Sequence, residues 1–273
     1  MCVIFTTVIS QPAHPPRRVV KIRGKMVKRK VLFLGVTGRI GPGILEDYEK
    51  NYKSYYGVVI GSRKKRKIEG YEVRVVDYSN VARLKKAMKG ISVVVNLAAE
   101  SDPSASFDEV LAPNIIGAYN VFEAARLAGC ERVIYASSVH AIRGYPLGKR
   151  VREDHAPKPS GFYGASKVFG ESLCYVFSKK YNLSCLAIRI GAYVSDDLRE
   201  KVCLNRDNYD YVISQRDMTQ LIHKCIVAPK SVRYGILSGS SDNKKKYMDL
   251  SFTKKLVGYK PKDDAYDFCK GLK

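Results

Sequence analysis

From Lys30 onward, short continuous apolar runs alternate with longer stretches in which hydrophobic residues recur at helical spacing. The apolar runs are rich in β-branched residues and predict strands at 31–35, 58–61, 73–77, 91–99, 132–138 and 183–191. The helical stretches start at Pro42, follow the capping residue Asn80, and cover 107–130 and 163–181. Buried strands that alternate with helices predict an α/β fold with a doubly wound parallel sheet covered on both faces.

The two ends of the chain differ from this middle part. After residue 190 we expect a helix near 216–227, a strand near 233–238 and a terminal helix, which together form a small C-terminal substrate-binding region, 191–273. Residues 1–27 place an apolar run before three prolines and a basic stretch, the reverse of the order in a secretory signal. We therefore interpret 1–27 as a disordered leader, or as sequence upstream of a true start at Met26.

Composition narrows the class of protein. The 273 residues contain no run near the ~18 apolar residues of a transmembrane helix. The seven cysteines include no Cys-x-x-Cys pair, and the four histidines form no ligand cluster. This pattern predicts reduced thiols in a cytoplasmic protein without a metal site. The net charge of +22 attracts polyanions, so nucleic-acid binding stays open as a minor alternative to solvated basic faces.

A glycine-rich turn lies between the first predicted strand and the first predicted helix. Gly35, Gly38 and Gly41 have the spacing G-x-x-G-x-x-G. Such glycines permit a sharp turn and let the backbone approach a diphosphate, while the helix N-terminus offers free N–H groups. The context predicts a Rossmann-type dinucleotide-binding domain over residues 28–190.

The end of the second strand bears on the choice of cofactor. An acidic residue there would bind the adenosine ribose and select NAD, but the sequence reads Gly61-Ser62-Arg63-Lys64. Arg63, with Ser62, predicts contact with a 2′-phosphate and hence NADP, with NAD as the alternative; a solvated basic loop is the other interpretation. Asp77, which ends the third strand, either accepts from the adenine amino group or caps the next helix.

Tyr163 and Lys167 stand four residues apart on the helix predicted at 163–181 and therefore share one face. A lysine ammonium beside a phenol lowers the pKa of the tyrosine, which makes it a usable general base for a substrate hydroxyl. Ser138 ends the fifth strand, and ligands bind at such strand ends in open parallel sheets. Asn114, in the preceding helix, is either an anchor for a proton-relay water or a polar residue of the helix surface.

Together these motifs resemble the extended branch of the short-chain dehydrogenase/reductase superfamily, over about residues 29–260. The chain is most similar to the uronate dehydrogenase-like group of the NAD-dependent epimerase/dehydratase family. The matching segments are GVTGRIG (35–41), LAAES (97–101), NIIG (114–117), ASSVH (136–140), YGASKVFGE (163–171), RIG (189–191) and VAP (227–229). The chain departs from that family at Val139, Ala192, Tyr193, Tyr247 and Met248, near the expected substrate site.

The resemblance implies roles for individual residues. Tyr163 would be the base, Lys167 the ligand of the nicotinamide ribose, Ser138 the residue that orients the substrate hydroxyl, and Asn114 part of the relay. The cofactor-binding set, with the strand-end residues, is Gly35, Gly38, Arg39, Ile40, Gly41, Ser62, Arg63, Asp77, Tyr78, Leu97, Ala98, Ala99 and Lys167. The substrate contacts are Ser101, Ser138, His140 and Arg199, the last either a clamp for an acid group or a solvated arginine. A homodimer through the Asn114 and Tyr163 helices is also implied.

Three functions follow from these observations. The leading hypothesis is an enzyme that transfers a hydride between NADP, or NAD, and a sugar or sugar-acid substrate. A nucleotide-sugar epimerase or dehydratase would use the same machinery, although the 82 residues of 192–273 leave little room to cover a nucleotide sugar. The third is a non-catalytic, NADP-sensing protein that binds nucleic acid, and the complete Ser138, Tyr163 and Lys167 set argues against it.

Overall fold

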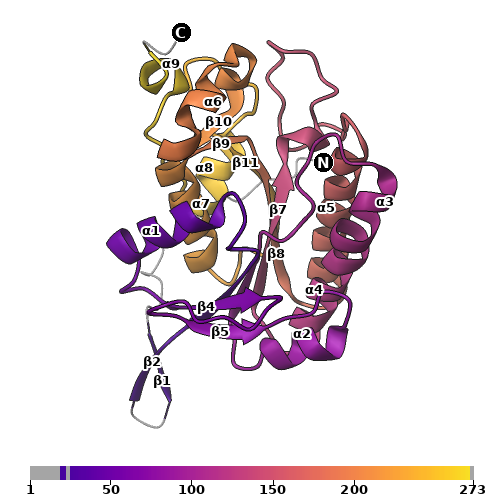
Figure 1. Cartoon of the computed structure of the whole chain (residues 1–273), viewed down its shortest axis with the longest axis vertical. Helices are drawn as coiled ribbons and strands as arrows, with labels where there is room; N and C mark the ends of the chain where they lie inside the picture. Colours follow the sequence, from indigo (N-terminus) through magenta and orange to yellow (C-terminus); the bar gives the residue numbers. More distant parts are fainter. Residues whose placement is uncertain (1–18, 23–24, 271–273) are drawn as a thin grey trace, which may run out of the picture.

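The computed structural model describes residues 19–22 and 25–270, and its centre is a sheet of seven parallel strands (Figure 1). In spatial order the strands are β11 (Tyr234–Gly239), β8 (Ser184–Ile190), β7 (Arg132–Ser138), β6 (Val93–Asn96), β3 (Lys30–Leu34), β4 (Gly57–Ser62) and β5 (Glu72–Val75). The chain leaves β3 toward β4 and β5, then returns to the other side at β6. The predicted doubly wound parallel sheet is thus confirmed. The strand order reverses between β3 and β6, and folds of this kind have a ligand-binding crevice at that point.

Helices cover both faces of the sheet, as the alternation predicted. One face carries α1 (Gly41–Asn51), α7 (Gln215–Val227) and α8 (Ser251–Val257). The other carries α2 (Val81–Ala87), α4 (Gly117–Leu127) and α5 (Phe162–Lys180). In Figure 1 the sheet lies between α1 and α7 on the left and α2, α4 and α5 on the right.

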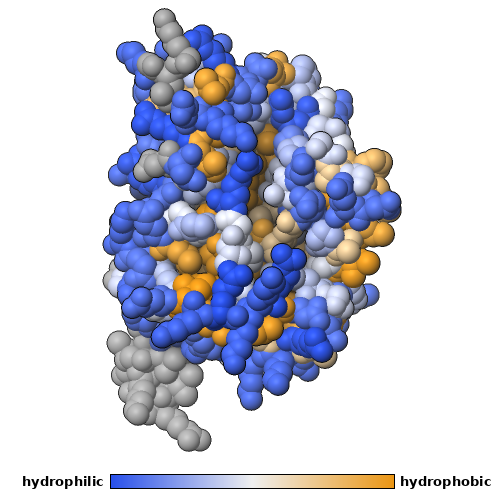
Figure 2. Space-filling model, in the orientation of Figure 1, coloured by the Kyte–Doolittle hydropathy of each residue, from blue (hydrophilic) through white to orange (hydrophobic). Residues whose placement is uncertain are grey.

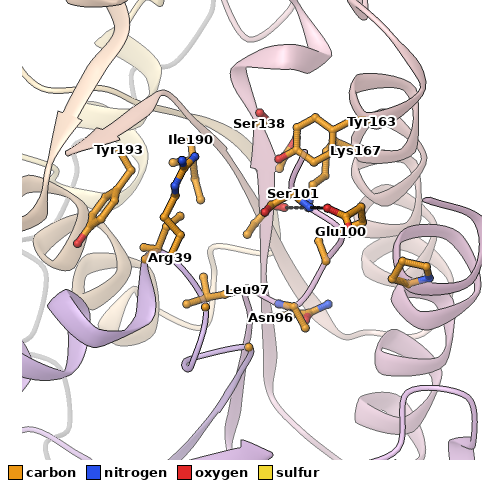
Figure 3. A pocket seen from close by; sticks show the side chains of 18 of the residues that line it. Arg39, Asn96, Leu97, Glu100, Ser101, Ser138, Tyr163, Lys167, Ile190 and Tyr193 are labelled. Atoms are coloured by element: carbon orange, nitrogen blue, oxygen red, sulfur yellow. Dashed lines mark hydrogen bonds between the residues drawn. The ribbon is translucent and has the colours of Figure 1, made fainter. Parts of the chain in front are cut away.

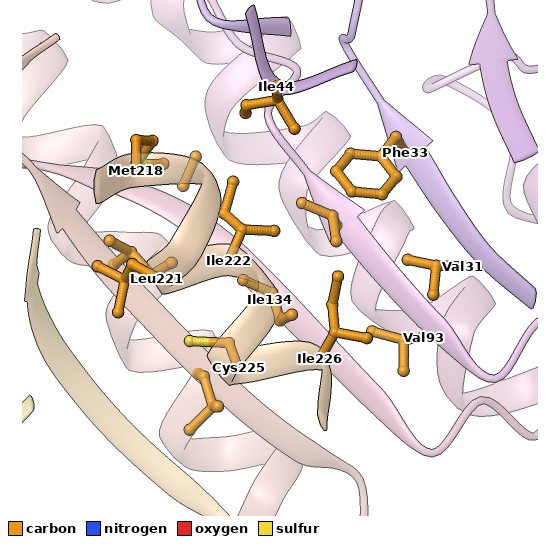
Figure 4. Packing of buried hydrophobic residues seen from close by; sticks show 14 of the residues in the cluster. Val31, Phe33, Ile44, Val93, Ile134, Met218, Leu221, Ile222, Cys225 and Ile226 are labelled. Atoms are coloured by element: carbon orange, nitrogen blue, oxygen red, sulfur yellow. The ribbon is translucent and has the colours of Figure 1, made fainter. Parts of the chain in front are cut away.

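Each face has its own hydrophobic core because neighbouring residues of a strand point to opposite sides. On β3, Val31 and Phe33 belong to one core and Leu32 and Leu34 to the other. Figure 4 shows the first core, in which α7 presents Met218, Leu221, Ile222, Cys225 and Ile226 to the side chains of Val31, Phe33, Val93 and Ile134. Burial on both faces explains why the strands appear in the sequence as continuous apolar runs.

The helix predicted at 107–130 is divided in three. α3 (Phe107–Val110) is followed by a π-helical turn, η1 (Leu111–Ile116), and then by α4. Pro113 lies in the wide turn, where its lack of an N–H removes a regular helical bond. The turn brings Asn114 against α5, where its amide nitrogen donates to Ser166 Oγ at 3.0 Å.

The C-terminal region holds elements that the periodicity did not predict. β9 (Ala192–Val194) and β10 (Val212–Ser214) form a separate parallel pair, and η3 (Asp196–Leu198), α6 (Arg199–Cys203) and η4 (Arg206–Tyr211) lie between them. The single terminal helix we expected is instead α8 and α9 (Ala265–Phe268). β11 joins this region to the main sheet, and the division at residue 190 stays a prediction.

The prediction that all cysteines are reduced is wrong for one pair. Cys203 at the end of α6 and Cys269 after α9 form a disulfide, and both residues are buried. Their separation of 66 residues gives no local signal, so only the fold brings them together. Cys130, Cys174, Cys185 and Cys225 are free and buried. The cytoplasmic location that we derived from reduced thiols stays a prediction.

Most of the predicted leader, 1–27, lies outside the described residues. Where the structure describes it, β1 (Val19–Ile22) pairs antiparallel with β2 (Lys25–Lys28), although we expected no regular element there. The two strands pair only with each other and add nothing to the seven-stranded sheet. Within the described ranges no helix is long and apolar enough to cross a membrane.

Candidate active site

A cleft of about 1280 Å³ opens at the carboxyl ends of the strands, beside the loops that follow β3 and β6. It lies on the face of the molecule shown in Figure 2, between the half that carries α1 and the half that carries α5. Sixteen of the predicted site residues line it: Gly35, Gly38, Arg39, Ile40, Ser62, Arg63, Asp77, Tyr78, Leu97, Ala98, Ala99, Ser101, Ser138, His140, Tyr163 and Lys167. Gly41, Asn114 and Arg199 are not among the lining residues.

The glycine loop forms the floor of the cleft where β3 meets α1. Gly35 has φ +77°, and a Cβ on it would lie 2.5 Å from the backbone nitrogen of Ala98, so only glycine fits between the loops that follow β3 and β6. Gly41 lies beneath the loop, where a Cβ would collide with the Val36 carbonyl. The first turn of α1 has no capping side chain and no acidic residue. Its free N–H groups and positive dipole end therefore suit a diphosphate.

The end of the cleft beside β4 and α2 is basic. Ser62 ends β4 and Arg63 follows it, and Arg83 reaches the same part of the cleft from α2. Arg83 pairs with the Asp77 carboxylate at 3.1 Å, while Asp77 Oδ1 accepts from Ser79 Oγ at 2.6 Å. Hydrogen bonds from the hydroxyl and the N–H of Ser79, together with the charge of Arg83, lower the pKa of Asp77. Arg83 is a second cation at this end of the cleft, and no sequence pattern predicted it as a site residue.

The inner end of the cleft, beside β7 and α5, brings together the predicted catalytic residues. Figure 3 shows Tyr163 and Lys167 of α5 beside Ser138 at the end of β7, with Arg39 and Tyr193 across the opening. The Lys167 ammonium donates to the Ala136 carbonyl at 3.0 Å and lies 5.4 Å from the centre of the Tyr163 ring. The side chains of Ser138, Tyr163 and Lys167 are all buried at the inner end of the cleft.

Burial dominates the titration of this pair. It raises the pKa of Tyr163 above its usual 10, although a hydrogen bond with Ser138 and the charge of Arg39 act in the opposite direction. Burial also lowers the pKa of Lys167 from 10.5 to about 7. We expected the lysine to lower the pKa of the tyrosine, but here the Lys167 ammonium is itself desolvated and turned to a backbone carbonyl.

Two predicted residues surround this group. His140 stands two residues after Ser138, packs edge-on against the Tyr163 ring with 5.7 Å between ring centres, and shares a hydrogen bond of 2.9 Å with Ser160 Oγ. Burial lowers the pKa of His140, and the charge of Arg143 acts in the same direction. Ser101 lies on the loop after β6, where its N–H donates to Glu100 Oε1 at 2.7 Å. Both line the opening above the tyrosine.

Asn114 has a different environment from the one we predicted. It is fully buried, accepts from the Glu100 N–H at 2.8 Å, and donates both to the Glu100 carbonyl at 3.1 Å and to Ser166 at 3.0 Å. Both amide hydrogens are thus used within the protein. The side chain fastens the loop of Glu100 and Ser101 to α5, and its part in a proton relay stays a prediction.

Arg199 does not reach the cleft. It is exposed on α6 and donates through Nε and Nη2 to the carbonyl of Phe268, next to the disulfide. The segment instead presents Lys201, Val202, Asn205 and Asn208 to the cleft. We missed these residues because 196–208 mixes acids, bases and amides without a helical pattern.

Comparison with known proteins identifies the family. Residues 31–206 match the NAD dependent epimerase/dehydratase family, and the chain belongs to this family. It is 31% identical to L-arabinose 1-dehydrogenase (NAD(P)(+)) of Haloferax volcanii over 220 residues, which cover 73% of this chain and 85% of that protein. It is 33% identical to a uronate dehydrogenase of Pseudomonas putida over 198 residues, 72% of this chain and 70% of the relative.

A solved structure of a uronate dehydrogenase has a similar fold. A uronate dehydrogenase mutant from Agrobacterium tumefaciens, complexed with NAD, superposes with a TM-score of 0.78 at 27% identity, covering 89% of this chain and 88% of that one. The predicted family, the fold and the prediction of an NAD(P)-dependent enzyme of the short-chain dehydrogenase/reductase type are confirmed. This result sets aside a purely non-catalytic protein.

Proposed function

We propose that the protein is an oxidoreductase that transfers a hydride between NADP and a sugar or sugar-acid alcohol, with Tyr163 as the general base. The observation that carries the proposal is the buried group of Ser138, Tyr163 and Lys167 at the inner end of the cleft. The sugar dehydrogenases to which the chain is similar support the substrate class.

The residues present suit a nicotinamide dinucleotide. The loop from Gly35 to Ile40 and the uncapped N-terminus of α1 would hold the diphosphate, with Arg39 beside it. Leu97, Ala98 and Ala99 follow β6 along the same wall. The bound dinucleotide would supply the hydride acceptor or donor.

The basic end of the cleft favours NADP. Arg63 lies near Tyr78 but makes no hydrogen bond or ion pair with a described side chain, and Arg83 stands near it with its other nitrogens free of the Asp77 pair. No carboxylate follows β4 to bind the ribose hydroxyls or repel a 2′-phosphate. Two guanidinium groups can bind such a phosphate through charge-assisted, forked hydrogen bonds.

In the oxidative direction, Ser138 would hold the substrate hydroxyl, and Tyr163 as phenolate would take its proton while the C–H hydride leaves. The protonated form of Lys167 and the phenolate stabilise each other, because opposite charges in a dry site interact strongly. In the reductive direction Tyr163 returns the proton to the carbonyl oxygen. Ser101 and His140 line the space above this oxygen and are the substrate contacts we propose.

Lys201 is the residue we now favour for an acid group on the substrate. It lines the cleft from α6, and no partner for its ammonium is present in the described part of the chain. Arg199, the earlier choice, is occupied by the Phe268 carbonyl. A sugar acid would place its carboxylate within reach of this lip of the cleft, next to Asn205 and Asn208.

We also propose that the protein forms a homodimer through α4 and α5. Large apolar side chains are exposed on and beside these helices: Phe107, Ile116, Tyr119, Leu127, Phe162, Tyr175, Val176 and Tyr181. Figure 2 shows hydrophobic residues along the edge where α3 and α4 lie. A cluster of this size is unusual on a free surface. Sedimentation equilibrium tests it: the parent should be a dimer, and Tyr119→Glu should shift it to monomer.

The test of the activity is a screen of NADP- and NAD-linked absorbance changes against uronates, aldoses and nucleotide sugars. Tyr163→Phe should lower turnover by about 10²–10⁴ and leave cofactor affinity intact, because only the phenolic hydroxyl is lost. Tyr175→Phe, on the same helix but outside the cleft, keeps its ring in the proposed dimer face; it is the matched control and should behave as the parent. Full turnover by Tyr163→Phe would contradict the assignment, and activity with nucleotide sugars alone would favour the epimerase.

A further inference from the structure

A buried ion pair lies directly beneath the catalytic group. The Glu171 carboxylate on α5 accepts from Arg189 Nε and Nη2 of β8, both at 2.8 Å. Its Oε1 also accepts from Ser137 Oγ of β7 at 2.7 Å. The side chains of Arg189 and Glu171 are only 2% and 3% exposed.

This pair joins one helix to two neighbouring strands at a single level of the sheet. Ser137 and Arg189 are directly paired partners in the β7–β8 ladder. Glu171 therefore bridges two residues that the sheet already holds side by side. Ser137 precedes Ser138, and Glu171 follows Lys167 by one helical turn.

The contacts between α5 and β7 form a series with a four-residue period. Tyr163 faces Ser138, Lys167 donates to the Ala136 carbonyl, and Glu171 holds Ser137. Gly170 permits the close approach, since a Cβ there would lie 2.2 Å from the ring of Tyr135. Apolar contact alone leaves a helix free to slide or turn slightly on a strand, whereas the directional bonds of Glu171 fix its position.

Stability alone does not require this arrangement. A buried ion pair is often matched or exceeded in stability by apolar residues of similar volume. An apolar pair would lack only the directional bonds that fix α5 along β7.

Resting on the proposed function, we infer that Glu171 and Arg189 are positioning residues, which set the placement of Tyr163 and Lys167 relative to Ser138. They touch neither substrate nor cofactor. Their effect reaches the reaction through the helix, so it is a matter of alignment. A misplacement of about 1 Å at a reacting group can lower a rate by about 10²-fold.

The test is the double variant Glu171→Met with Arg189→Met, which removes both charges and keeps the volume. We expect a thermal midpoint near that of the parent, cofactor affinity within about threefold, and kcat lower by about 10- to 100-fold. The crystal structure of the variant should show the Tyr163 and Ser138 hydroxyls displaced by about 1 Å. Parental kcat, or lower kcat with parental geometry, would overturn the inference.

Arg132→Met is the matched control. Arg132 is also a buried arginine in the β7–β8 pair, but at the opposite end, where it donates to Ser184 and to the carbonyls of residues 225, 228, 229 and 232. Its loss should lower the thermal midpoint and leave the kcat of the folded protein within about twofold. An equal loss of kcat in this control would make lost stability the explanation and overturn the inference.

Two further measurements keep the test decisive. If the double variant does not fold, Ser137→Ala keeps the ion pair and removes one bond to Glu171. It should then lower kcat by roughly 3- to 10-fold with little change in the thermal midpoint, and unchanged kcat would refute the positioning role. If the parent shows no turnover with any substrate, the proposed function fails, but the displacement of Tyr163 in the double-variant crystal still decides the positioning role.

Discussion

Lys167 should make the folded protein less stable than it would be with an apolar residue at this position. Lys167 is 3% exposed, and within the described part of the chain its ammonium donates one hydrogen bond, to the Ala136 carbonyl. Burial lowers its pKa from 10.5 to about 7. Since each pKa unit corresponds to about 1.4 kcal/mol, folding at pH 7 loses about 4 kcal/mol through this group. Lys167→Met fills a similar volume and removes that loss.

The variant gives up the hydrogen bond to Ala136, which is worth about 1–2 kcal/mol. We therefore expect Lys167→Met to raise the free energy of unfolding by about 2–3 kcal/mol at pH 7. For a domain of this size that is a rise of about 5–10 °C in the thermal midpoint. Turnover should be lost in the same variant, because the charge beside Tyr163 is gone. The catalytic lysine is thus expected to oppose stability.

The pH dependence has a definite sign. Between pH 7 and 10.5 the unfolded lysine carries a proton that the folded one has released, so the stability of the parent rises with pH in this window. The advantage of Lys167→Met should therefore shrink and vanish near pH 9.5. Urea unfolding of the cofactor-free proteins at pH 7 and 9.5 measures it, with Lys180→Met, at the exposed end of α5, as control. A variant less stable than the parent at pH 7, or an advantage independent of pH, would refute the reasoning.

Three further outcomes are expected. Arg63→Asp should invert the preference from NADP to NAD by about 10-fold or more, as lost charge-assisted bonds predict, and equal affinity of the parent for both cofactors would contradict the phosphate site. Reductant should lower the thermal midpoint of the parent by about 5–10 °C through loss of the Cys203–Cys269 bond, and Cys269→Ser should start at the lower value and not respond. Deletion of residues 1–25 should leave a folded, active protein, because β1 and β2 pair only with each other; a large fall in the thermal midpoint would show that the leader packs on the domain.

The parts of the fold that follow from local pattern were predictable. Strands buried on both faces leave continuous apolar runs, so β3, β4, β7 and β8 were found nearly to the residue. The glycine loop and the Tyr163–Lys167 spacing are local as well. Their meeting with Ser138 followed from one rule, that the strand ends of a parallel sheet share an edge.

The rest depends on contacts between distant residues. Glu171 stands one turn after Lys167 and Arg189 lies within a predicted strand, but a charged residue in a sequence is expected to face water, so the ion pair between them was not predicted. Arg83 reaches the cleft from α2, a helix that packs against α4. Lys201 lines it because the 196–211 segment is held by the C-terminal residues. The wide turn at Pro113, in turn, decides that Asn114 binds a loop.

The order of the strands in the sheet has a consequence for the newborn chain. β8 is buried along its whole length between β7, which is made before it, and β11, which is made after it. About 50 residues separate the end of β8 from the end of β11, and at ~5–20 residues per second the ribosome needs roughly 3–10 s to add them. During that interval the outer edge of β8 offers unpaired N–H and C=O groups beside apolar side chains, the kind of edge that pairs with other chains. We therefore expect the chain to be prone to aggregation in this interval, when Ser138, Tyr163 and Lys167 have already been made but the sheet that holds them is still incomplete.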